Sequence, residues 1–163
     1  MKIKITLLLA PLTFWAASVG TACAAPPNDA CSLLTQEQVT AVLGVSVGAG
    51  VKVVPNSSAL CGWDVPGEKS FNRKRVVLNI YTQMGSLTPV QRFNNAKTPI
   101  AGITKVPVTG VGDDAVFAVT PGFGTGLIFR KGDAAFDLRV YGFPNDQAEI
   151  KEKALAQDVL AKL

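Results

Sequence analysis

Phe136-Asp137-Leu138-Arg139-Val140-Tyr141 alternates apolar and polar side chains without a break. Because successive side chains of a β-strand point to opposite faces, Phe136, Leu138 and Val140 share one face and the polar residues share the other. This pattern is typical of an antiparallel sheet with one buried and one polar face. We therefore expect an α+β fold in which helices cover a twisted, mainly antiparallel sheet.

A helix is predicted after this strand, beginning at Asn145 behind Pro144. Asp146 and Glu149 lie near its start, where the helix dipole favours acids. Its apolar stripe comprises Ala148, Leu155, Ala156, Val159, Leu160 and Leu163, and Ile150 falls outside that stripe.

Further strands are predicted upstream, at 51–54, 60–65, 75–81, 103–108, 115–119 and 127–130. Two helices are marked by their first residues. Thr35 and Gln38 have the spacing of a capping box, and Gly44 ends that helix. Thr88-Pro89 supplies an N-cap and a first-turn proline, so a helix to about Asn95 follows.

Two of the three cysteines, Cys31 and Cys61, are predicted to form a disulfide, since an even pair in an exported chain favours one. On the chain-entropy model the crosslink contributes about 3–4 kcal/mol. Trp63 lies two residues after Cys61, so the indole shares its face and is expected beside the disulfide.

Residues 1–24 have the charged, apolar and small-residue order of a secretory signal peptide, which favours periplasmic or secreted localisation. The apolar run is shorter than the roughly 20 residues of a membrane span. Ala22-Cys23-Ala24 suits simple cleavage before Ala25. The alternative is lipidation of Cys23, which would anchor the protein to the membrane, although Gly20 departs from the usual lipobox.

Residues 25–30 are predicted to be a linker and residues 31–163 a single domain. The formal net charge of +4 falls by two when Lys2 and Lys4 leave, which argues against a strongly charged partner and against nucleic acid. The chain contains no histidine. Cys31 and Cys61 alone are a poor set of metal ligands, and the sequence has no cofactor motif, so we expect no metal site and no cofactor.

Gly44-Val45-Ser46-Val47-Gly48 matches the G-x-S-x-G elbow of serine hydrolases. That elbow needs a strand before the serine and a helix after it, whereas here a helix precedes Ser46. Without histidine no Ser-His-acid triad can form. We interpret the segment as a helix stop followed by a loop.

Gly122-Phe123-Gly124-Thr125-Gly126 resembles a phosphate-binding loop, but a strand rather than a helix is expected to follow. The segment is better interpreted as a hairpin loop. Phe123, beside Pro121, would then be an apolar ring available to a ligand or partner.

Two charged clusters are further binding candidates. Lys69, Arg73, Lys74 and Arg75 precede a strand with only Glu68 opposing them in the sequence. They are either a solvated loop or a contact for anionic headgroups or an acidic polymer. Asp113 and Asp114 are adjacent and should point apart, one of them bonding backbone N–H groups; the alternative is a calcium ligand pair.

The segments Cys31-Ser32-Leu33-Leu34-Thr35, Cys61-Gly62-Trp63, 110–116 and 130–133 together resemble a family of small bacterial envelope proteins. Many of its members are lipoproteins described only as domains of unknown function. The resemblance implies, more distantly, a PsbP-like α/β/α sandwich that acts by binding. It supplies no active-site residues.

The sequence thus favours an exported, non-catalytic binding, accessory or sensory module whose partner is an envelope protein or small ligand. The sheet's polar face or the loop around Phe123 would form the contact. One alternative is an inhibitor of an envelope enzyme. A second is a hydrolase with an unorthodox serine centre at Ser46.

Overall fold

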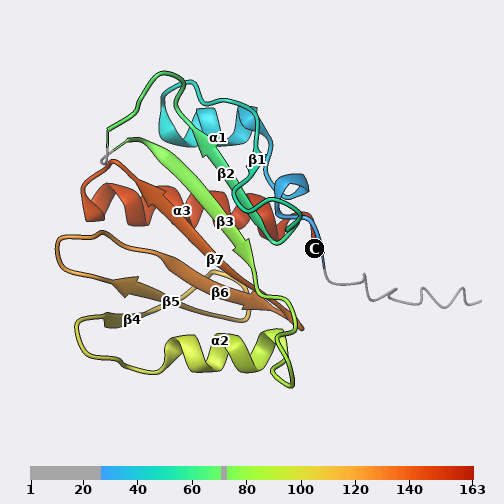
Figure 1. The fold of residues 1–163 in the computed structure, drawn as a ribbon. Helices are drawn as coiled ribbons and strands as arrows, with labels where there is room; N and C mark the ends of the chain where they lie inside the picture. Colours follow the sequence, from blue (N-terminus) through green and yellow to red (C-terminus); the bar gives the residue numbers. More distant parts are fainter. Residues whose placement is uncertain (1–26, 71–72) are drawn as a thin grey trace, which may run out of the picture.

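The computed structural model describes residues 27–70 and 73–163, so the predicted signal peptide and Cys23 lie outside the described residues. It is an α+β fold, as the sequence predicts: a seven-stranded antiparallel sheet of order β1-β2-β3-β7-β6-β5-β4 with helices packed on it (Figure 1). The elements are η1 (Ala30–Ser32), α1 (Gln36–Leu43), β1 (Val51–Lys52), β2 (Leu60–Asp64), β3 (Arg75–Ile80), α2 (Pro89–Lys97), β4 (Thr104–Val108), β5 (Asp114–Val119), β6 (Leu127–Lys131), β7 (Ala134–Tyr141) and α3 (Asn145–Leu160).

Two meanders build the sheet. Strands β1, β2 and β3 pair in chain order, and so do β4, β5, β6 and β7. The two meanders join where β3 pairs with β7, with Leu78 opposite Leu138. Helix α2 is the connection from β3 to β4, so it must cross the sheet from its middle to its far edge.

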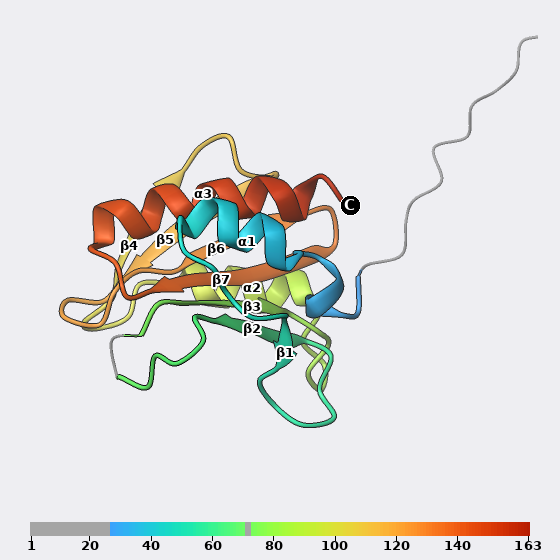
Figure 2. The same cartoon turned by 90° about the horizontal axis from the view of Figure 1, so that it is seen from above.

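The helices divide between the two faces. α1 and α3 lie side by side over one face, where the larger core contains Trp63, Phe129 and Phe136 (Figure 2). α2 packs on the other face against β6 and β7, and its Phe93 lies in a second, smaller core with Ile128. The alternation of β7 follows from this division: Phe136, Leu138 and Val140 are buried towards α1 and α3.

The first helix begins and ends as its sequence predicts. The Thr35 hydroxyl accepts from the Gln38 N–H, and the Gln38 side chain accepts from the Thr35 N–H, which completes the capping box. Gly44 follows with a φ of 73°, a left-handed conformation that few residues other than glycine adopt. Helix α2 has the same kind of box between Thr88 and Gln91.

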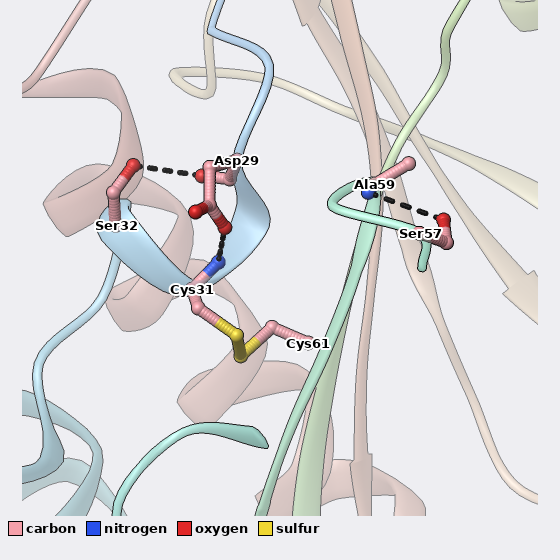
Figure 3. The surroundings of a disulfide bond; sticks show 6 residues. All are labelled: Asp29, Cys31, Ser32, Ser57, Ala59 and Cys61. Atoms are coloured by element: carbon pink, nitrogen blue, oxygen red, sulfur yellow. Dashed lines mark hydrogen bonds between the residues drawn. A yellow bond between two sulfur atoms is a disulfide. The ribbon is translucent and has the colours of Figure 1, made fainter. Parts of the chain in front are cut away.

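The Cys31–Cys61 disulfide joins η1 to β2, with the two Cα atoms 5.1 Å apart (Figure 3). The Asp29 carboxylate accepts from the Cys31 N–H and holds the start of η1. Ala30 is buried and donates its N–H to the Ser58 carbonyl, so the packed chain already includes these last residues of the predicted linker. Such crosslinks are typical of proteins that fold in an oxidising compartment.

Trp63 is fully buried beside the disulfide, as its spacing from Cys61 predicts. Gly50 lies against both groups. A methyl group added at Gly50 would come within 2.7 Å of the indole Nε1 and 2.9 Å of the Cys61 Sγ. The close approach of the chain to the indole therefore requires glycine at this position.

Helix α3 departs from its predicted stripe at three positions. Glu152 is fully buried on the same face as Ala148 and Leu155, whereas Leu160 is only half-buried and Leu163 is 36% exposed. Ile150, which falls outside the predicted stripe, is 71% exposed. The apolar pattern of the sequence does not predict that Glu152 is buried. A buried carboxyl needs a hydrogen-bond partner, and only the folded chain supplies one.

The main-chain N–H of Val140 is that partner, because it donates to Glu152 Oε1 at 2.9 Å. The pairing of β6 with β7 ends at Leu127 and Leu138, so the next N–H of β7 on that side has no strand partner. The carboxyl of Glu152 takes the place of the missing carbonyl. Burial raises the pKa of Glu152 to about 8, so the group is mostly protonated at neutral pH.

We expect Gly50→Ala to destabilise the protein by about 1–3 kcal/mol, because the methyl group would overpack the indole and the disulfide. Gly48→Ala is the matched control in the same loop, since its methyl group would meet only the Asp64 carbonyl oxygen, at 3.7 Å. Urea unfolding of both variants measures the difference. Equal free energies of unfolding would contradict the packing described here.

The raised pKa of Glu152 predicts that stability falls as pH rises. Between the ordinary carboxyl pKa of 4.5 and about 8, the folded chain holds a proton that the unfolded chain has lost. This group therefore lowers the free energy of unfolding by up to about 1.4 kcal/mol per pH unit across that window. Glu152→Gln should flatten the slope and exceed the wild type in stability at pH values above 8.

Urea unfolding across this pH range tests the expectation. Glu149→Gln is the control, because it makes the same chemical change at a half-exposed position of α3 and should retain the slope. A slope that persists in Glu152→Gln and disappears in Glu149→Gln would contradict the assignment.

Candidate functional site

The loop from Thr120 to Gly126 is a hairpin connection between β5 and β6, as the sequence predicts. A strand follows it, so its N–H groups are not presented at a helix start. Phe123 is 76% exposed and Pro121 is also exposed. The loop thus presents an apolar ring to solvent.

The basic cluster at the β2–β3 connection is partly neutralised by the fold. Asp64 Oδ1 lies 2.9 Å from Arg73 Nε and 3.3 Å from Arg75 Nε. The ammonium of Lys74 lies 5.8 Å from the centre of the Phe143 ring, and Lys69 is exposed. Asp64 is therefore an opposing acid that inspection of the local sequence overlooked, since 64 and 73 meet only when β2 and β3 pair.

The two acids at the start of β5 point apart, as expected from their adjacency. Asp113 accepts from the Gly132 N–H at 2.7 Å, and this bond, with the nearby Lys131, holds its pKa below the usual value. Asp114 pairs with Lys97 of α2. Each acid ties two segments together, and among residues 27–70 and 73–163 no group of three or more His, Cys, Asp or Glu residues is placed to hold a metal ion.

Ser46 is exposed in the loop that leads from α1 to β1. The order helix–serine–strand is the reverse of a nucleophile elbow. The disposition agrees with the interpretation of this segment as a helix stop and loop.

The polar residues of β7 lie on the α2 side of the sheet, where two adjoining hollows meet. The larger, which we name the Lys105 hollow, has a volume of about 240 Å³ and the smaller, the Tyr141 hollow, about 170 Å³. Asp137 and Arg139 line both. The walls of the Lys105 hollow also include Tyr81, Ile100, Ile103, Lys105 and Ile128; those of the Tyr141 hollow also include Leu60, Val77, Asn79 and Tyr141.

The sheet register brings these residues together. Asp137 of β7 lies opposite Asn79 of β3 and Ile128 of β6, and Lys105 of β4 lies opposite Ala118 of β5. Directly opposed residues of an antiparallel pair share a face. These residues therefore come from five strands of the sheet, β3 to β7.

Arg139 and Asp137 form a bidentate ion pair between the two hollows. Arg139 Nε lies 3.0 Å from Asp137 Oδ1, and Nη2 lies 3.1 Å from Oδ2. The carboxylate raises the pKa of the Arg139 guanidinium further. Two of its five N–H donors point to Asp137, so the guanidinium is fixed in place and retains donor capacity.

Gly126 makes room for this guanidinium at the end of the Phe123 loop. A methyl group there would lie 3.0 Å from Arg139 Cγ and 3.1 Å from Arg139 Nε. The connection after α2 reaches the same end of the sheet, because Thr104 pairs with Val119 (Figure 1). The fold thus places the Phe123 loop next to the polar face of β7. These two candidate binding surfaces are separate in the sequence.

Lys105 is the unusual charge in the larger hollow. Its side chain is half-buried and, within the described part of the chain, makes no hydrogen bond or ion pair. Burial lowers the pKa of Lys105; the Asp137 carboxylate opposes this effect, and the neighbouring Arg139 adds a smaller lowering. The sequence alone does not indicate a role for Lys105, because a single lysine between Thr104 and Val106 is typical of an exposed strand. Its position in the hollow depends on how the strands pair.

No protein-family model matches the chain, and neither the curated proteins nor the solved structures compared with it gave a match. No helix of residues 27–70 and 73–163 has the length and apolarity needed to cross a membrane.

Gly126→Ala is expected to displace the Arg139 side chain and weaken its bidentate contact with Asp137. The side chain can move aside, so the free energy of unfolding should change by less than about 1 kcal/mol. The Arg139 Nε–H signal in a proton–nitrogen correlation spectrum should shift and exchange faster with water. An unchanged Nε–H signal would contradict the contact.

Proposed function

We propose that the chain is an exported binding module of the bacterial envelope that holds a ligand without catalysing a reaction. Its ligand site would be the Lys105 hollow, next to the Phe123 loop, of which Thr120 lines the hollow. One observation carries the proposal: a half-buried lysine with no polar partner among the described residues and a fixed guanidinium line the same hollow, whose walls also include several aliphatic side chains. A few convergent polar groups in an apolar hollow are typical of ligand sites.

The Cys31–Cys61 crosslink and the signal-like leader support periplasmic or secreted localisation. Lipidation at Cys23 remains the alternative route to the envelope. The exposed Phe123 gives some support to the second candidate function, inhibition of an envelope enzyme, since an inhibitor must present a protruding apolar residue.

Fragment screening by NMR tests the proposal on oxidised protein comprising residues 25–163. We expect the fragments that bind to shift the amide signals of Ile103, Lys105, Asp137 and Arg139, and not those near Lys52 on the opposite edge strand. Hits that cluster elsewhere, or a library without hits, would contradict this site.

A serine-reactive phosphonate probe tests the catalytic alternative. We expect no labelling of the folded protein, because Ser46 follows a helix and lies in an exposed loop. Stoichiometric labelling of Ser46 would contradict a non-catalytic role.

A further inference from the structure

The charges around the Lys105 hollow do not cancel. Lys105 and Arg139 bring two positive charges, and Asp137 brings one negative charge. Most other cations have partners: Lys97 pairs with Asp114, and the Lys151 ammonium donates to the Val42 carbonyl. The hollow is therefore left with a single excess positive charge.

The half-buried Lys105 side chain has no hydrogen-bond acceptor or ion-pair partner among the described residues, and its ammonium carries three N–H donors. A ligand oxygen carrying negative charge would supply that acceptor. Asp137 limits how much negative charge fits, because a dianion would leave one charge uncompensated beside this carboxylate. The charge balance favours a ligand with one negative charge.

The walls of the hollow favour an aliphatic body for that ligand. Ile103 and Ile128 are joined there by Ile100, Ala96 and Ala118, beside the polar side chains of Asn95, Thr98 and Thr120. Ile100 is 57% exposed, so an apolar ligand would remove more of its surface from water. A volume of about 240 Å³ limits the part of the ligand that is held to a small group.

We propose that the Lys105 hollow binds a carboxylate carried on a short aliphatic body, with the carboxylate on Lys105 and Arg139 and the body against Ile103 and Ile128. This inference rests on the proposed function and names its ligand class. Such a carboxylate occurs on a free aliphatic acid and on the C-terminal residue of a peptide.

Titrations followed by NMR, with hexanoate and its uncharged analogue hexanamide, test the charge requirement. We expect hexanoate to bind with a roughly millimolar Kd, shifting the amide signals of Lys105 and Arg139, and hexanamide to bind at least tenfold more weakly. Acetyl-alanyl-isoleucine and its C-terminal amide form the second arm. Whichever carboxylate binds more tightly identifies the source, and both results support the proposal.

Variants test the residues. Lys105→Met keeps the aliphatic stem and should weaken hexanoate binding at least tenfold, whereas Lys105→Arg should retain it. Asp137→Asn removes the opposing charge and should tighten binding several-fold. Lys52→Met, on the exposed edge strand β1, is the control and should bind as the wild type does.

Two results separate this inference from the proposed function. If hexanamide binds at the same amides as tightly as hexanoate, or if Lys105→Met binds as the wild type does, the carboxylate preference is wrong and a ligand site in the hollow stands. If no fragment shifts the amides of this face, the proposed site fails and the ligand class fails with it.

Discussion

The pairing of β3 with β7 is the constraint on which the rest of this structure depends. Each meander contains only neighbours in the chain, and this one ladder joins residues about sixty positions apart into a continuous sheet. It puts β7 in the middle, where both of its faces can be covered. It also places the meander of β1, β2 and β3, which carries the crosslink to η1, beside the C-terminal half of the chain.

The same pairing decides which part of the sheet stays open. Because β3 lies in the middle and β4 at an edge, α2 must cross over β6 and β7 as it connects them. α1 and α3 occupy the opposite face. A single nine-residue helix covers only part of its face, so Asp137 and Arg139 emerge beyond it, between two hollows. The candidate site is thus a consequence of the path that α2 takes from β3 to β4.

Mismatched strand lengths create the second unusual feature. β7 continues to Tyr141, whereas its pairing with β6 ends at Leu138. The Val140 N–H beyond that point would be buried without an acceptor, and Glu152 supplies one from α3. The fold therefore satisfies a backbone group with a carboxyl whose burial makes it hold its proton at neutral pH. As a consequence, the free energy of unfolding is expected to fall as pH rises.

The sequence by itself determined what depends on near neighbours. The alternation in 136–141, the capping boxes at Thr35 and Thr88 and the stop at Gly44 are local, so they predicted the elements and the α+β class. The even cysteine pair predicted the crosslink because composition and compartment suffice for that inference. Asp137, Arg139 and the Phe123 loop were recognised as a polar face and a separate loop. Only the tertiary structure decided that they adjoin, that Lys105 faces them and that Glu152 is buried. Those relations depend on strand register and on where β6 ends, which are contacts between distant residues and leave no periodic signal in the chain.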